Sequence, residues 1–167
     1  MADLSPQERL QPALLDRLTD HDPGQKIESR DRRVISVQRL RECIRRDLAW
    51  LLNTGRLETV MNLDEYPEVA DSVLNYGIPD LTGLSVAGAN TELIEKAVKS
   101  AILKFEPRLL KNSLRVTVTA DPQKMFRNSM TFKIECEMWA QPIPQSMFLH
   151  TELDLETGDV KVSEGGR

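Results

Sequence analysis

The sequence predicts an α+β fold, in which N-terminal helices precede a small antiparallel sheet of three to four strands and pack on one of its faces. Up to Phe105, apolar residues recur at intervals of three and four, which is the period of an amphipathic helix. After Phe105 they alternate with polar residues, as in half-buried strands. Pro107 marks the change, because it disfavours helical geometry at Glu106. Helices followed by strands are typical of the α+β class.

The N-terminal part contains one short amphipathic pattern that is set apart from the rest. The pattern over residues 6–19 predicts a helix, residues 20–24 break it, and residues 25–33 form a polar, exposed linker. We therefore divide the chain into an N-terminal helix with the start of a linker (1–24), a single α+β domain (25–163) and a frayed tail (164–167). The first helix is expected to dock apart from the main body.

A second helix is predicted directly after Ser36, which is a favourable N-cap residue. Gly55 is expected to stop this helix by adopting the left-handed conformation that is common just past a helix end. The helix carries one clean apolar stripe, formed by Val37, Leu40, Ile44, Leu48 and Leu51.

A third, short helix is predicted between two backbone signals. Pro67 suits its first turn, where the missing N–H is unpaired in any case. Gly77 fits the position just past its end, which allows Ile78 to contact Val73 as in a Schellman motif. Pro79 then prevents the helix from restarting.

The remaining elements are a loop, one more helix and the strands of the sheet. Residues 81–89 contain two glycines and predict the loop, and residues 91–105 predict the helix. Strands are predicted over residues 114–119, 131–138, 148–155 and 160–162, with a turn over residues 156–159. Such a sheet has two free edges, and a free edge can accept a strand from another chain.

The net charge argues against a nucleic-acid-binding protein, and the charges are unevenly distributed along the chain. The 167 residues carry a net charge of −4 with pI near 5.3, which argues against nucleic acid as the main partner. Basic residues gather within residues 26–46 and acidic residues within residues 152–164. This polarity indicates either two solvated faces or a field that steers a partner, and the sequence leaves both open.

Hydropathy predicts a cytoplasmic protein that does not insert into a membrane. The N-terminus has neither a basic region nor an apolar core of the kind found in signal peptides. No stretch approaches the roughly 20 apolar residues that span a bilayer. Cys43 and Cys136 each lie within an apolar pattern, as expected for small buried residues in a reducing compartment.

The search for catalytic, metal-binding or cofactor-binding groups gives no candidate. His21 and His150 lack the neighbouring ligands that a zinc site needs, and no phosphate-binding loop or nucleophile elbow is present. Glu106 with an acid from residues 64–71 is a conceivable glycosidase pair, but no spacing singles out two carboxylates. We therefore expect no catalytic residue, no metal and no cofactor.

Glu106, Pro107 and Arg108 form the most specific polar feature of the chain. In extended backbone the first and third side chains point the same way, and the guanidinium fork of Arg108 suits a carboxylate. Two interpretations stay open. Either the corner is pinned by its own ion pair, or its charges dock a partner.

Residues 51–54, 66–81 and 106–109 form three blocks that resemble the TssE family. Its members are baseplate subunits of type VI secretion systems and are similar to the wedge proteins of contractile phage baseplates. The most specific block runs from Tyr66-Pro67-Glu68-Val69 to Pro79-Asp80-Leu81, and the resemblance covers about residues 8–163. Ile78 stands where leucine is more frequent in the family, and Gly55 where a basic residue is.

The resemblance implies a structural function rather than an enzymatic one. It implies a place in a cytoplasmic baseplate wedge at the inner face of the membrane, with the subunits TssF and TssG and near TssK. It also implies that the chain starts polymerisation of the sheath subunits TssB and TssC by offering a sheet edge. The family's Glu-Pro-Arg motif, implicated in assembly, maps onto Glu106, Pro107 and Arg108, which are thereby the candidate partner-binding residues.

Two alternative functions accompany this resemblance. Phage relatives have carried a lysozyme label, so a peptidoglycan glycosidase is the enzymatic alternative. The second alternative is a regulatory binding protein, because a related fold occurs in a protease anti-adaptor. The lack of a distinguishable acid pair gives the glycosidase little support.

Overall fold

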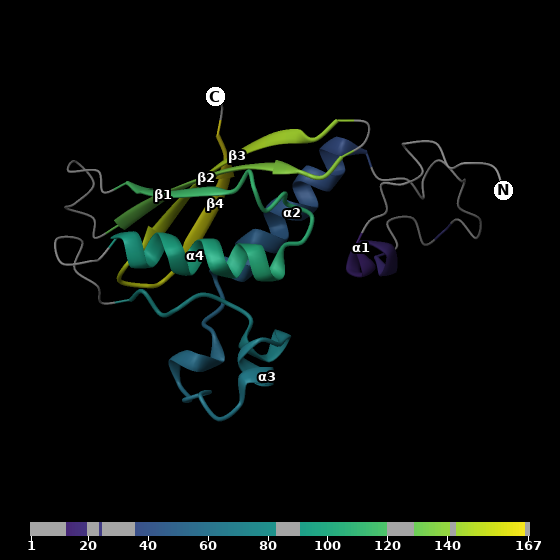
Figure 1. Ribbon diagram of the computed structural model, residues 1–167. Coiled ribbons are helices and arrows are strands. Elements are labelled where there is room, and N and C mark those ends of the chain that lie inside the picture. Colours follow the sequence, from purple (N-terminus) through teal and green to yellow (C-terminus); the bar gives the residue numbers. More distant parts are fainter. Residues whose placement is uncertain are drawn as a thin grey trace.

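The computed structural model describes residues 13–19, 24, 36–82, 91–119, 129–140 and 143–165. Figure 1 shows a four-stranded sheet with helices α2 and α4 against one of its faces, and a small lobe around α3 that projects beyond the helices. The predicted α+β class, with helices first and an antiparallel sheet after them, is confirmed.

The helical elements occupy the first two thirds of the chain and the strands the last third. The helices are α1 (Leu14–Leu18), α2 (Val37–Leu52), α3 (Pro67–Ala70) and α4 (Thr91–Phe105), with single 3-10 turns η3 (Leu57–Thr59) and η4 (Val73–Asn75). The strands are β1 (Arg115–Thr119), β2 (Ser129–Met138), β3 (Gln145–Asp154) and β4 (Val160–Glu164).

The sheet is an antiparallel meander in the order β1-β2-β3-β4. Its two central strands bury alternate side chains, so that Ile134 lies opposite Leu149 and Cys136 opposite Met147. The intervening side chains, such as Lys133 and Glu135, face solvent. One face of the sheet therefore packs on the core while the other is wet, which is the alternation that the sequence pattern predicted.

Helix α2 begins as predicted but does not end as predicted. Ser36 caps it, because its Oγ accepts a hydrogen bond from the backbone N–H of Arg39 at 3.1 Å. The helix ends at Leu52 with Asn53 as its C-cap. The prediction of a left-handed Gly55 is wrong, since the residue is absent from the positive-φ glycines and forms a parallel bridge to Ile78. The pairing of these two segments in space, rather than a glycine stop, sets the backbone there.

The prediction of a single short helix from Pro67 to Gly77 is also wrong, because two short elements, α3 and η4, take its place. Pro67 does occupy the first turn of α3, but that helix ends at Ala70. Ser72 then interrupts the helix and caps η4 through its Oγ, which accepts from the N–H of Leu74. Gly77 has a φ of +127°, and Ile78 donates its N–H to Thr54 O at 2.9 Å rather than back to the helix.

Other boundaries differ from expectation by a few residues. Of the helix predicted over residues 6–19, only the five residues of α1 are helical within the described part, and residues 6–12 lie outside it. The predicted linker lies outside the described residues, as do residues 83–89 of the predicted loop. Strand β3 begins at Gln145, three residues early, because Gln145 pairs with Met138 at the end of β2. Strand β4 extends to Glu164, two residues past the predicted end, so Glu164 belongs to the sheet and not to the predicted frayed tail.

Candidate functional site

The Glu106–Pro107–Arg108 corner joins the end of α4 to the end of β2. The N–H of Glu106 makes a last helical hydrogen bond to Ile102 O at 2.9 Å, and Pro107 has no N–H to continue the series. Beyond the proline, Arg108 O accepts the N–H of Trp139 at 2.7 Å. The corner is thus tied by its backbone to both the helix and the sheet.

Glu106 and Arg108 form an ion pair with each other inside the chain. Glu106 is only 3% exposed, and its Oε1 accepts from Arg108 Nε at 2.6 Å and from the Arg108 backbone N–H at 3.2 Å. Its Oε2 accepts from Arg108 Nη2. Of the two interpretations that the sequence left open, this geometry supports the pinned corner, since a buried carboxylate needs such partners. Both oxygens of Glu106 thus accept hydrogen bonds from Arg108.

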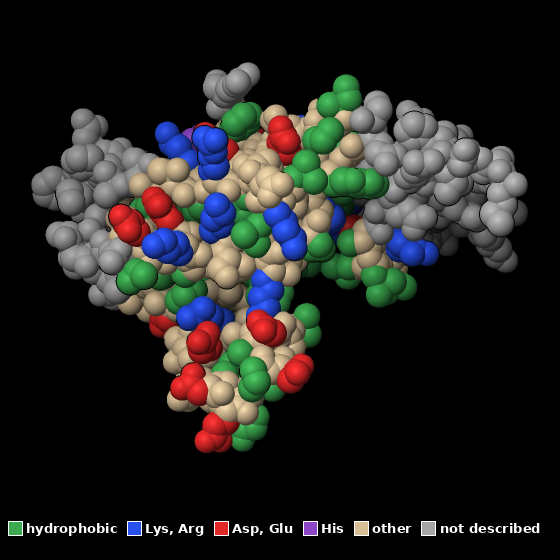
Figure 2. Space-filling view, viewed as in Figure 1, with side chains coloured by type: hydrophobic (Ala, Val, Ile, Leu, Met, Phe, Trp, Pro, Cys, Tyr) green, Lys and Arg blue, Asp and Glu red, His purple; other side chains and the backbone are tan. Residues whose placement is uncertain are grey.

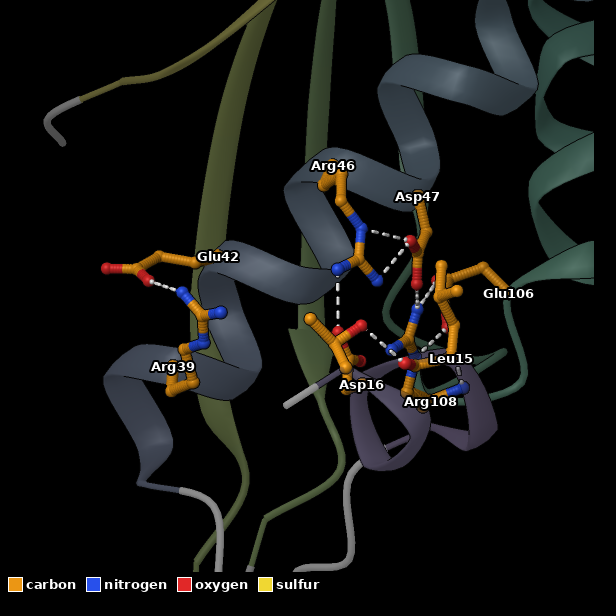
Figure 3. Close-up of polar contacts among 9 residues, drawn as sticks. Leu15, Asp16, Arg39, Glu42, Arg46, Asp47, Glu106 and Arg108 are labelled. Atoms are coloured by element: carbon orange, nitrogen blue, oxygen red, sulfur yellow. Dashed lines mark hydrogen bonds and ion pairs between the residues drawn. The ribbon is translucent and has the colours of Figure 1, made fainter. Parts of the chain in front are cut away.

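The ion pair is one end of a longer chain of alternating charges. Arg108 Nη2 also donates to Asp47 Oδ2 at 2.6 Å, and Asp47 Oδ1 accepts from Arg46 Nε at 2.8 Å. Arg46 Nη1 in turn donates to Asp16 Oδ1 at 2.6 Å. Figure 3 shows that these side chains come from three elements, the corner, α2 and α1, and point toward one another. The network therefore fastens the short first helix to the body of the protein, and the expectation that this helix docks apart from the body is wrong.

The network stabilises the charged forms of Asp16, Arg46 and Arg108. Burial lowers the pKa of Arg108, but the bonds to Glu106 and Asp47 outweigh it and raise the pKa overall. Burial raises the pKa of Asp16, and the hydrogen bonds from Arg46 and Cys43 outweigh it so that the net shift is downward. The hydrogen bond to Asp16 raises the pKa of Arg46. All three groups are consequently ionised near neutral pH.

An apolar hollow of about 540 Å³ lies beside the network. Leu15 of α1, Trp50 of α2 and Tyr76 line it together with the three corner residues. Within its walls the ring of Tyr76 meets that of Phe105 edge to face at 5.0 Å, and the Arg46 guanidinium lies 4.9 Å over the Trp50 ring. Pro107 is exposed at this site. The hollow combines an apolar wall with fixed charges, which is a surface suited to protein contacts.

The structure brings the three candidate residues together but adds three that sequence reasoning missed. Asp16, Arg46 and Asp47 complete the network. A signal for Asp47 was present, because it lies three residues after Ile44 and four before Leu51, on the buried stripe of α2. A carboxylate at such a position needs a cation nearby. No comparable signal marks Asp16.

Each edge strand of the sheet is partly covered by a helix side chain. On β4, the Asn53 amide clamps Val160, with Nδ2 donating to Val160 O at 2.8 Å and Oδ1 accepting its N–H at 2.9 Å. On β1, the N–H of Val118 donates to Glu95 Oε1 at 2.8 Å. Antiparallel alternation turns the N–H and C=O of Val162 and Glu164 outward as well, beyond the reach of the Asn53 clamp.

Metal and thiol chemistry find no support among the described residues. No group of three or more His, Cys, Asp or Glu side chains in this part of the chain is arranged to hold a metal ion. Burial raises the pKa of Cys136 to about 12, and it also raises the pKa of Cys43, so both remain protonated thiols. Within the same residues, no helix is long and apolar enough to cross a membrane.

The fold and its charge network define a small α+β protein whose most strongly bound polar groups hold structural elements together. The family model described as baseplate wedge protein gp25 matches residues 38–143, which is more than half of the chain. The chain therefore belongs to the baseplate wedge protein gp25 family, which includes TssE, and the resemblance inferred from the sequence is confirmed at this level. No curated protein and no solved structure matches the chain.

Membership in this family gives the chain a structural role in the baseplate of a contractile injection system, where it contacts other baseplate components. The family is a structural one, which agrees with the expectation of a non-enzyme.

Proposed function

We propose that this protein is a wedge subunit of a type VI secretion baseplate, assembled in the cytoplasm at the inner face of the membrane. In this role it binds TssF and TssG, lies near TssK, and templates the polymerisation of the sheath subunits TssB and TssC. The observation that supports the templating role is the outer half of β4, where the backbone N–H and C=O groups of Val162 and Glu164 point away from β3. Family membership supplies the baseplate context.

Strand β4 is better suited than β1 to accept an added strand. Val162 and Glu164 offer two N–H and two C=O groups in an unbroken row, whereas Glu95 already occupies the outward N–H of Val118 on β1. The Asn53 clamp on Val160 sets one boundary of the row. At the other end, Arg41 binds Glu164 at 2.6 Å and fixes the strand against α2.

This last contact also bears on the uneven charge of the sequence. Arg41 belongs to the basic stretch of residues 26–46 and Glu164 to the acidic tail. At least one pair between the two regions is thus made within the chain, and it stabilises the edge proposed to meet the sheath.

A proline substitution on each edge strand tests whether β4 or β1 accepts the added strand. Val162→Pro removes an outward N–H from β4 while keeping its bonds to β3, and edge strands tolerate such a change. Val116→Pro is the matched control on β1, where the outward N–H likewise does not face the neighbouring strand. In cells with fluorescent sheath, we expect the β4 variant to lose sheath assembly and the β1 variant to retain it. Normal sheaths with a folded Val162→Pro protein would exclude strand addition at β4.

Glu106, Pro107 and Arg108 are proposed as a second contact, in which the ion pair holds exposed Pro107 and the hollow in place for another wedge subunit. Pro107→Ser keeps both charges and is expected to reduce sheath assembly without loss of stability. Arg108→Ala and Glu106→Ala complete the series. Normal assembly with all three variants would remove the motif from the mechanism, whereas loss of assembly only in variants that unfold would reduce it to a structural corner.

A further inference from the structure

Residues 57–82 form a projecting lobe with an unusual charge. They hold η3, α3 and η4, and we call them the acidic lobe. They contain no Lys, Arg or His, and their charge is −6, so that the rest of the chain carries +2 against a total of −4. Figure 2 shows the acidic side chains gathered on this lobe, with Lys and Arg side chains on the body above it. Its six acids are Glu58, Asp64, Glu65, Glu68, Asp71 and Asp80.

The lobe also exposes several large apolar side chains beside a groove. Val60, Val73 and Leu74 are 83%, 77% and 67% exposed. All three line a groove of about 610 Å³ that reaches Leu153 of β3 and Gly158 of the turn between β3 and β4. Met61 and Tyr66 are half exposed on the same lobe. Single exposed apolar residues are ordinary, but a cluster of them with a polar rim is typical of an interaction surface.

Polar bonds hold the lobe in shape, so the exposure of these side chains is a property of the fold. Buried Asn75 joins two of its segments, as Oδ1 accepts the Glu58 N–H at 3.0 Å and Nδ2 donates to Ala70 O at 3.1 Å. Lys104 of α4 donates to the same Ala70 carbonyl at 2.6 Å. A surface fixed in this way loses little conformational entropy when a partner binds.

Most of the lobe's charge is available to an external cation. Arg56 and Lys104, at its base, pair with Glu58 at 3.3 Å and Asp71 at 3.1 Å. Within the described residues, the other four acids have no ion-pair partner, and these are Asp64, Glu65, Glu68 and Asp80. Asp80 lines the groove, and the other three acids are exposed elsewhere on the same lobe, so a partner that covers the lobe would meet uncompensated negative charge.

We propose that the acidic lobe is a docking surface for a protein segment that presents an apolar stripe flanked by Lys and Arg. The stripe covers Val60, Val73 and Leu74, and the flanking cations lie against the unpaired acids of the lobe. Charge complementarity selects this occupant, since an acidic or neutral segment would leave the acids of the lobe repelled or unpaired. The surface uses neither the Glu106–Arg108 corner nor the outward row of β4, and it contains the tyrosine-proline-glutamate-valine block that those contacts leave unexplained.

A designed peptide tests the proposal without the rest of the baseplate. The probe is a fluorescent amphipathic helix of about 18 residues, with a leucine stripe flanked by Lys and Arg, and binding to the full chain is followed by anisotropy. We expect Val73→Ser with Leu74→Ser to weaken binding about tenfold, because two apolar contacts are lost. Both side chains are exposed, so the fold should persist and the unfolding midpoint should stay unchanged.

A matched pair of charge variants separates docking from general attraction. Glu65→Gln with Glu68→Gln and Glu135→Gln with Glu137→Gln change the net charge equally, but only the first pair lies on the lobe. We expect the lobe pair to weaken binding about tenfold at low salt and the control pair, on the solvent face of β2, to have little effect.

Three results would overturn the proposal. They are equal losses in the two charge pairs, unaffected binding in the double serine variant, and a dimer in light scattering that the double serine variant dissociates. The last would identify a second copy of this chain as the occupant. None of these results depends on sheath assembly, so failure here is distinguishable from failure of the templating role.

Discussion

Replacing Arg108 with alanine is the most informative perturbation of the corner. The change would leave the carboxylate of Glu106 almost fully buried without its counter-ion, because Arg108 supplies all three of the hydrogen bonds found on that carboxylate. One of the three comes from the Arg108 backbone and survives the substitution. Asp47 would lose one of its two cationic partners.

The expected loss of stability follows from the burial of Glu106 and Asp47, the two partners of Arg108. Breaking a buried ion pair by removing one partner costs about 3–5 kcal/mol. The contact with Asp47, which is more exposed, adds at most about 1 kcal/mol. A loss of about 4 kcal/mol in the free energy of unfolding corresponds to a fall in Tm of about 8–16 °C for a chain of this length.

Urea denaturation of Arg108→Ala, Glu106→Gln and the double variant, followed by circular dichroism, measures these terms. Because an amide needs no counter-charge, Glu106→Gln should recover part of the loss when it is added to Arg108→Ala. A loss below about 1 kcal/mol in Arg108→Ala, or a double variant as unstable as the sum of the two single changes, would refute the reasoning.

Three further predictions concern other contacts. Asp16→Asn should cost about 1 kcal/mol at pH 7, because Arg46 lowers the pKa of Asp16 in the folded protein. This stabilisation is present above the unfolded pKa and is lost as the pH falls through the folded pKa, so the unfolding free energies of the two proteins in denaturant titrations should converge as the pH falls below about 4. Asn53→Ala should cost about 1–3 kcal/mol and speed hydrogen exchange at the Val160 amide, whose acceptor it removes. Gly77→Ala should cost more than about 2 kcal/mol in thermal unfolding, because its φ is +127° and a Cβ would lie 2.2 Å from a backbone carbonyl oxygen.

Each of these three predictions has a control or an outcome that would contradict it. Gly55→Ala meets no atom within 4 Å and should change stability little, so an equal loss at both glycines would contradict the steric argument. Asn53→Asp keeps the acceptor for Val160 N–H but loses the donor, and slow exchange there would be retained. An Asp16→Asn difference that does not shrink as the pH falls below the unfolded pKa of aspartate would show that charge is not what Asp16 contributes.

The local features of this fold could be predicted from the sequence because they depend on neighbouring residues. Ser36 caps α2 through an N–H three positions away, and Pro67 opens α3 where its missing N–H costs nothing. The strands β1 to β4 follow from a two-residue alternation of side chains, which also determines the face that is buried. These are short-range properties of the chain.

Predictions that depended on a distant segment failed or could not be made. Gly55 and Gly77 were both expected to end helices, but the pairing of Ile78 with Thr54 and Gly55 sets the backbone at both places. The boundary of β3 moved because Gln145 pairs with the end of β2. In each case a hydrogen bond between segments that are not neighbours in sequence outweighed a local preference.

The sequence by itself determined the fold class, the family resemblance and the unusual charge of residues 57–82. Periodicity, motifs and composition depend only on the order and type of residues that are close together in the sequence. The tertiary structure decided that Glu106 and Arg108 bind each other and that Arg108 also reaches Asp47, which is 61 residues away. It also decided which backbone groups of the edge strands are covered. The physical reason is that an ion pair or a capped edge depends on distance in space, and charge type alone does not give the partner.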